Sequence, residues 1–312
     1  MRGRGGADRK RSFALVPLVR ALALFLLMLV PVIGVTALEV TALYHMGNLG
    51  FGRDAESTTD EFSGTDYTYG ASVYGNHQID DSLSLEAGLF YDPVLRRTIQ
   101  TRFEYRHNYF SIGVGPFLGV FNTPGSVLKS GISSSVRIEY PGKVFASVRS
   151  DSTIAARFTK KGDYLQELNK LTVGYYIPHA ICSLNMTTKR FITQKTESLE
   201  VDDALTEFSF DVDLYQKNVP VRLLLSFAYR HIDRIYSTDT ATEENNLNSL
   251  LFGTRFQVEA SPRLTLIADI DHNIYTFGNV KPATGSGYVL EMPESGLGMY
   301  LFQGRIGGTW KF

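Results

Sequence analysis

Apolar and polar residues alternate with a period of two along most of the chain after residue 37. The clearest segment is 82–91, where Leu83 and Leu85 alternate with Ser84 and Glu86. A period of two is typical of a β-strand that turns one face to an apolar environment and the other to water. We find no comparable helical periodicity in this part of the chain, so the pattern predicts an all-β protein.

The connections between the alternating segments are short and long in turn. Six turns are tight, and the intervening connections are mostly longer and polar; the tight turns are 79–81, 107–108, 141–142, 178–179, 216–219 and 260–262. This rhythm is typical of a transmembrane antiparallel up-and-down β-barrel, with short turns on one rim and long loops on the other. We predict about 14 strands, within a range of 12 to 16: 38–46, 67–74, 82–91, 99–106, 109–121, 132–140, 144–149, 171–177, 180–188, 205–215, 221–231, 248–259, 263–275 and 300–312.

A soluble secreted sandwich or solenoid is the alternative fold, because its strands also alternate. Such a fold would not order its loop lengths so regularly. The longest predicted loops of the barrel are 151–169, 189–204 and 276–299, and they are polar enough to be exposed. The last of them also holds Val280, Tyr288, Leu290 and Met292, so it could fold into the barrel mouth as a constriction.

The amino-terminal segment has the order of a secretory signal peptide. Six basic residues precede an unbroken apolar run at 21–30, and Val35, Thr36 and Ala37 follow as a cleavage pattern. A membrane anchor is the alternative, but the run is about half of the ~20 residues that span a bilayer. We therefore predict a signal peptide at 1–37, cut between Ala37 and Leu38, and a barrel domain at 38–312.

Charge and cysteine content narrow the possible partners. Removing residues 1–37 takes six of the 31 Lys+Arg and one of the 32 Asp+Glu, which leaves 25 bases against 31 acids. Without a basic excess, nucleic acid is not an expected partner. Cys182 is the single cysteine, so the chain can form no internal disulfide and no cysteine metal cage. We expect no metal and no cofactor.

The carboxyl-terminal segment resembles the assembly signal of bacterial outer-membrane β-barrel proteins. Arg305, Gly307, Trp310 and Phe312 fall on the polar, glycine, bulky apolar and terminal aromatic positions of that signal. The resemblance covers residues 38–312 by pattern, in the size class of monomeric fourteen-stranded porins. It implies a bacterial outer-membrane location, with membrane lipid and the barrel-assembly machinery as partners. The fatty-acid transporters of similar size have an N-terminal hatch, for which this chain leaves no room.

The face opposite the apolar one carries charges of both signs. Fourteen strands would enclose a backbone cylinder roughly 28 Å across, with a lumen of about 15 Å unless loops block it. Charges on adjacent strands can pair across the wall, or they can form acidic and basic faces that select solutes. We predict these pore-lining residues: Arg102, Glu104, Arg106, Arg137, Glu139, Arg149, Glu207, Asp211, Asp213, Arg222, Arg230, Arg255, Asp269, Asp271 and Arg305.

A channel for passive diffusion of small polar solutes is the function that this pattern favours. Two alternatives stay open: a surface protein whose long outer loops bind a host or partner molecule, and a transporter of the long-chain fatty-acid type. We do not expect an enzyme. His231 and Asp233 could form a base and its orienting carboxylate at the outer end of a strand, but no serine stands out as a nucleophile.

Overall fold

The computed structural model describes residues 37–47, 68–121, 127–153, 164–196, 199–216, 218–237, 242–280, 289–290 and 302–312. Fourteen strands in this part of the chain form one closed antiparallel barrel, and a two-residue strand, β14 (Val289–Leu290), pairs only with β13. The barrel strands are β1 (Ala37–Gly47), β2 (Thr68–Gln78), β3 (Leu83–Asp92), β4 (Arg96–Arg106), β5 (Phe110–Phe121), β6 (Val127–Tyr140), β7 (Val144–Thr153), β8 (Leu165–Ile177), β9 (Ala180–Thr196), β10 (Leu199–Tyr215), β11 (Val221–Ser237), β12 (Thr242–Ser261), β13 (Leu264–Val280) and β15 (Phe302–Lys311).

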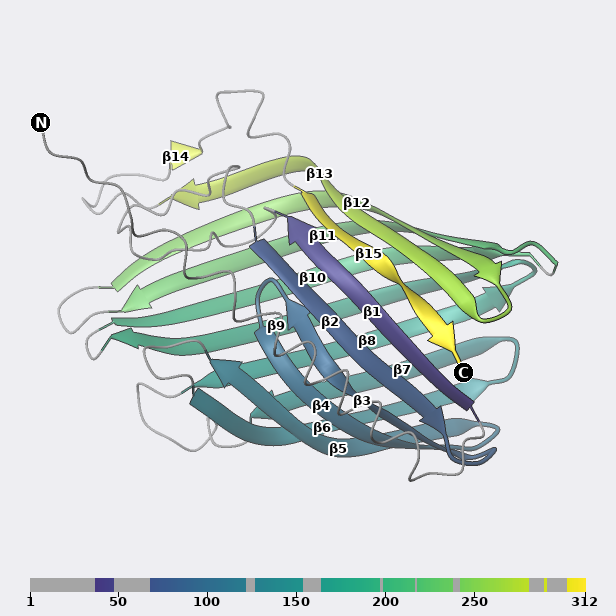
Figure 1. Ribbon diagram of the computed structural model, residues 1–312. Coiled ribbons are helices and arrows are strands. Elements are labelled where there is room, and N and C mark those ends of the chain that lie inside the picture. Colours follow the sequence, from purple (N-terminus) through teal and green to yellow (C-terminus); the bar gives the residue numbers. More distant parts are fainter. Residues whose placement is uncertain are drawn as a thin grey trace, which may run out of the picture.

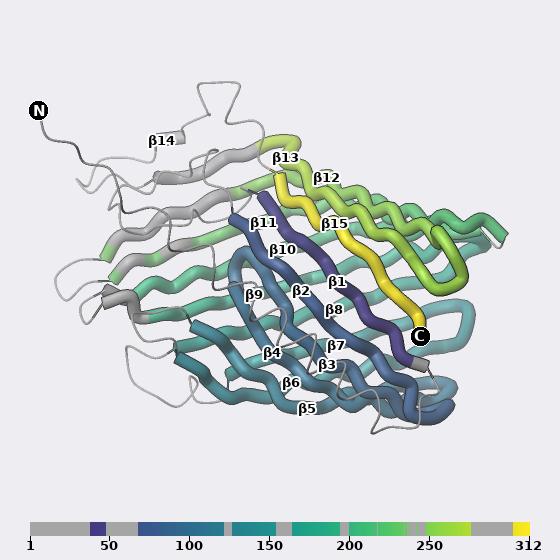
Figure 2. Tube along the Cα trace, in the orientation of Figure 1, coloured from purple at the N-terminus to yellow at the C-terminus, as the bar shows by residue number. Residues whose placement is uncertain are grey.

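Each strand pairs with its neighbours in sequence, and β1 pairs with β15 to close the ring (Figures 1 and 2). The seam runs from Glu39↔Lys311 to Gly47↔Gln303. Gly307 sits within it, where an added Cβ would lie 1.9 Å from the Ala42 carbonyl oxygen. A residue with a side chain would therefore push β15 and β1 apart, which is a structural reason for glycine at this position of the predicted assembly signal.

All six predicted short turns lie on one rim, which we call the short-turn rim. Asp80 builds the turn between β2 and β3: its Oδ1 accepts hydrogen bonds from the Ser82 amide and hydroxyl and from the Leu83 amide. These bonds lower the pKa of the Asp80 carboxyl. In the turn between β6 and β7, Gly142 has a φ of +68°, a conformation that glycine adopts at little cost.

The outer surface of the barrel is apolar across its middle. Val173, Leu184 and Phe210 form one row across β8, β9 and β10, and all three side chains are exposed. A water-soluble barrel would place large apolar side chains inside; here they cover the outside, as a lipid-facing surface requires. Trp310 and Phe312 lie on the same face near the short-turn rim. The predicted fold class and the strand count are confirmed.

The long-loop rim differs from the prediction. The range 189–204, predicted as a loop, is a hairpin in which β9 and β10 pair as far as Thr196↔Leu199. β11 and β12 likewise pair through most of the predicted loop 232–246. Period-two alternation with one apolar face marks only the part of a strand that lies in lipid; beyond the membrane both faces are polar, so the sequence pattern reads as a loop.

Two predictions lie outside the described residues. The predicted signal peptide covers 1–37, of which only Ala37 is described, and the constriction predicted at 276–299 is described only at 276–280 and 289–290. Among the described residues, we find no helix that has the length and the apolar character to cross a membrane.

An arginine in the apolar row should destabilise the barrel. Leu184 lies at the centre of this row and is 64% exposed. We therefore expect Leu184→Arg to lower the free energy of unfolding in lipid vesicles by about 2–4 kcal/mol. Val219→Arg, in the turn between β10 and β11 at the short-turn rim, is the matched control and should cost at most about 1 kcal/mol. Urea titration followed by tryptophan fluorescence measures both. Equal costs at the two positions would contradict a lipid-facing Leu184.

Candidate functional site: the barrel interior

Ion pairs between neighbouring strands line the inside of β10 to β15. Glu207 accepts from Arg230 at 2.7 Å (Oε2 to Nε), and Asp213 pairs with Arg222. On the next strands, the Asp269 carboxylate joins Arg255 and Arg305, at 2.7 and 2.5 Å from their Nη2 atoms. Each pair spans adjacent strands, so the charges compensate one another along the wall.

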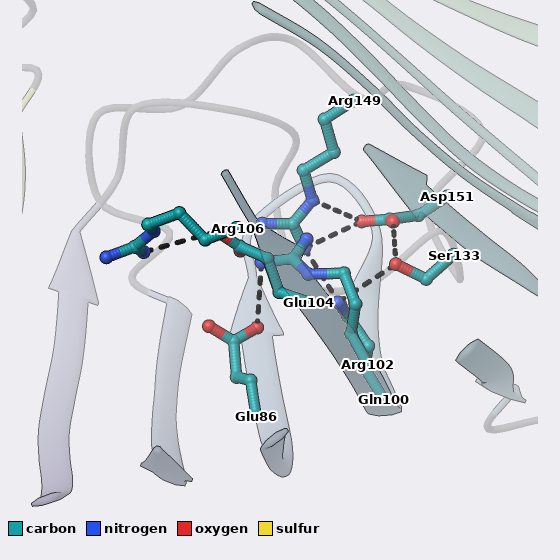
Figure 3. A network of polar contacts seen from close by, with 8 residues as sticks. All are labelled: Glu86, Gln100, Arg102, Glu104, Arg106, Ser133, Arg149 and Asp151. Carbon is teal, nitrogen blue, oxygen red and sulfur yellow. Dashed lines mark hydrogen bonds and ion pairs between the residues drawn. The ribbon is translucent and has the colours of Figure 1, made fainter. Parts of the chain in front are cut away.

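A second polar network covers the inside of β3 to β7 (Figure 3). Arg149 donates to Asp151 and to the Gln100 side chain, both at 2.8 Å. Gln100 donates to Ser133, and the Ser133 hydroxyl donates to Asp151 at 2.6 Å. These contacts connect β4, β6 and β7. The alternation in the sequence predicts only that these side chains point inward, whereas the hydrogen bonds also fix their orientation.

Arg102 stands apart in the same network. It pairs with Glu86 on β3 at 3.3 Å, while its Nε and Nη1 atoms are buried and have no hydrogen-bond partner among the described residues. A buried guanidinium with two free donors is a position where water or a solute anion would be favoured.

The predicted pore-lining residues lie on the face opposite the exposed apolar side chains, and the structure brings most of them into pairs. Arg106 pairs with Glu104, and Arg137 pairs with Glu139. Asp211 accepts from the Ser226 hydroxyl and from the Asn185 amide. Near the short-turn rim, a cavity of about 150 Å³ opens between Asp213, Arg222, Leu224, Arg255 and Gln257.

The end of the hairpin between β3 and β4 separates from β2, while β4 stays paired with β5 as far as Arg97↔Val120. The ladder between β2 and β3 runs from Gln78↔Ser84 to Val73↔Leu89 and ends there, although β2 continues to Thr68 and β3 to Asp92. The Tyr91 amide instead donates to the Ser72 hydroxyl, and the Tyr91 ring lies over Gly70, where a Cβ would be 2.1 Å from its Cγ. The end of the hairpin therefore folds toward the inside of the barrel.

The tip of this hairpin packs against the opposite wall. Val94 is 3% exposed and forms an apolar cluster with Phe121 of β5, Phe191 of β9, Leu205 of β10 and Ile232 of β11. We call these five residues the tip cluster. Since β5 and β9 to β11 lie on different sides of the ring, the tip cluster crosses the lumen.

Polar contacts hold the same tip. The Asp92 Oδ2 atom lies 2.5 Å from the Lys189 Nζ atom on β9, and its Oδ1 atom accepts from the Val94 and Leu95 amides. The Gln166 side-chain amide of β8 donates to the Leu95 carbonyl and, at 3.2 Å, to the Arg97 carbonyl. Thus β8 and β9 both bind the hairpin end.

A comparison of free energies explains why the inward position of the hairpin end is stable. Returning to the wall would add about three residue pairs to the ladder between β2 and β3, at about 1 kcal/mol for each net hydrogen bond. Burying Val94 and Leu95 inside contributes about 1.5–3 kcal/mol per side chain. The pair with Lys189 adds to the second sum, which therefore exceeds the first.

The tip cluster corrects one sequence-based expectation. Phe121 and Leu205 point inward, although apolar residues of the predicted strands were expected to face lipid, and Phe191 and Ile232 lie in strands where loops were predicted. Among the described residues, the short connection 93–95 packs into the lumen. The signal available in the sequence was Asp92-Pro93, a turn-forming pair, followed by apolar Val94 and Leu95 at a position expected to face water.

His231 and Asp233 do approach each other: the Nε2 and Oδ2 atoms are 2.9 Å apart. The residues between them and beside them, Ile232 and Arg230, point inward, so the pair is on the outside of the barrel wall. The other ring nitrogen, Nδ1, lies 2.7 Å from the Asn248 side-chain oxygen. Among the described residues, the hydrogen-bond partners of the His231 ring are Asp233 and Asn248, and neither is a serine or a cysteine.

Neither a group of metal ligands nor an exposed thiol is found in the described part of the chain. No group of three or more His, Cys, Asp and Glu residues there is arranged to hold a metal ion. Cys182 is buried as a free thiol in the wall.

No family model and no curated protein match the sequence. Among solved structures, an outer membrane channel from Pseudomonas putida F1 is similar at 9% identity, with 90% of this chain and 97% of that chain covered and a TM-score of 0.47. An anion-selective porin from Comamonas acidovorans matches at 13% identity, 89% and 99% coverage and a TM-score of 0.37. OmpT, an outer membrane protein of Vibrio cholerae, matches at 11% identity, 88% and 96% coverage and a TM-score of 0.37. At this level of similarity, the solutes of these proteins say nothing about the solute of this chain.

Buried and exposed interior pairs should differ in their contribution to stability. The Arg230 side chain is 9% exposed beside Glu207, whereas the Arg106 side chain is 66% exposed beside Glu104. Arg230→Ala leaves the Glu207 carboxylate, whose side chain is 22% exposed, without its partner, and we expect it to cost about 3 kcal/mol. Arg106→Ala should cost at most about 1 kcal/mol. Unfolding midpoints from heat-modifiable electrophoresis compare the two, and similar midpoints would refute the buried pair.

Proposed function

We propose that this protein is a bacterial outer-membrane channel through which small polar solutes diffuse passively. The observation that carries the proposal is the combination of a closed ring, an apolar exterior and an interior lined by ion pairs. A ring built only to anchor loops needs no 14 strands, since eight strands already fill with side chains. In this proposal, the signal peptide at 1–37 directs export and is removed.

The tip cluster is the level of the proposed path at which described apolar side chains from different sides of the ring pack together. Between it and the short-turn rim, the inner face of β10 carries Glu207, Asp211 and Asp213, and that of β11 carries their partners Arg230, Ser226 and Arg222. At the tip cluster itself the same faces become apolar at Leu205 and Ile232. An aqueous path that ends at an apolar constriction suits a channel that is closed in its resting state, because a narrow apolar segment dewets.

No chemical step is part of this proposal. His231 and Asp233 lie outside the lumen and contact no nucleophile among the described residues, so a hydrolytic role has no geometric support. We expect His231→Ala to leave the channel properties of the protein unchanged.

Planar bilayer recordings test the proposal. The refolded protein should give discrete current steps with a low open probability, and replacing 93–95 by Asn-Gly should raise the open probability because the tip cluster loses Val94. Refolding of both proteins is verified by heat-modifiable electrophoresis. If neither folded protein gives current steps, the channel is refuted, and a loop-mediated surface-binding function becomes the better account.

A further inference from the structure

We propose that the wall around Lys189 is a binding site for a solute carboxylate, and that Asp92 occupies it in the closed state as an internal substitute. The inference rests on the proposed channel function and names the solute class that opens it. In this mechanism, a carboxylate that binds Lys189 releases Asp92, and the hairpin end between β3 and β4 moves away from the tip cluster.

The contacts of Asp92 are those of a bound carboxylate. One oxygen, Oδ2, lies 2.5 Å from the ammonium nitrogen of Lys189, and the other is held by two amides of its own turn. The charges of Asp92 and Arg230 also interact across the lumen. Asp92 and Lys189 are 97 positions apart in sequence, and the ion pair joins the end of the hairpin between β3 and β4 to β9.

The departure of Asp92 would leave the Lys189 ammonium group, whose side chain is 21% exposed, without the carboxylate that it binds in this structure. A solute carboxylate in the same place would restore the ion pair.

The released hairpin has a defined place to go. Continuing the register Val73↔Leu89 would set Gly70 opposite Asp92, on the part of β2 that precedes the ladder with β3. Rejoining this edge would extend the ladder and withdraw Val94 from the lumen. The hairpin turn already stores some strain, since Arg96 has a φ of +65°, in the region that favours glycine.

The accessibility of Val94 shows whether the hairpin end between β3 and β4 lies in the lumen. We would use Val94→Cys in a Cys182→Ser background and measure its labelling by a water-soluble maleimide, with benzoate as the carboxylate and benzamide as the neutral control. Val94 is buried in the closed state, so its labelling should be slow. Benzoate should raise the labelling rate severalfold, and benzamide should leave it unchanged.

Two further variants test whether the contact between Asp92 and Lys189 controls the labelling, and a third controls for a general loss of stability. Asp92→Asn should raise the labelling rate roughly tenfold without benzoate and abolish the response to it, the change expected on losing one charge-assisted contact. Gly70→Ala should raise the rate as well, because the new Cβ displaces the Tyr91 ring. Asp202→Asn, which removes the pair between Asp202 and Arg190, is the matched control and should label like the parent.

The outcomes distinguish this inference from the channel itself. Labelling that responds to benzoate in a protein without current steps would support the carboxylate site and refute the channel. Current steps in a protein whose labelling ignores both benzoate and Asp92→Asn would support the channel and overturn the carboxylate site.

Discussion

Backbone hydrogen bonding in a medium without water is the constraint on which the rest of this structure depends. Each amide and carbonyl that lies in the bilayer core must find a partner within the protein, so strands can cross only as a closed ring. The seam between β1 and β15 provides that closure, and Gly307 lets the two strands approach. Closure then fixes the parity of all strands: one set of side chains meets lipid, and the other lines the interior.

The hairpin between β3 and β4 is the place where the structure departs from this rule. Three residues of β3 give up their ladder with β2, and the tip gains a buried apolar cluster and an ion pair with Lys189. The gains exceed the losses by only a few kcal/mol, a difference that a ligand with preference for the other position can offset. A barrel with complete ladders would have a permanently open lumen. In this barrel the end of the hairpin between β3 and β4 lies in the lumen, and its movement back to β2 would open it.

The fold was predictable from the sequence because lipid imposes a strict alternation. Segments such as Leu83–Asp92 and Leu264–Val280 show it, and the six tight turns follow from residues such as Asp80 and Gly142. The strand extensions beyond the membrane were missed because nothing there forces one face to be apolar. The inward tip was missed because a two-residue apolar turn has no period, and its partners, Phe121 and Ile232, come from distant strands.

Amide hydrogen exchange of the protein in lipid nanodiscs tests the central claim most directly. The account predicts strong protection along the β1–β15 seam and along Val73–Gln78, together with fast exchange at those amides of Thr68–Ser72 that point away from β1. Rapid exchange along the seam would contradict the closed ring. Uniform protection from Thr68 to Gln78 would contradict the inward hairpin.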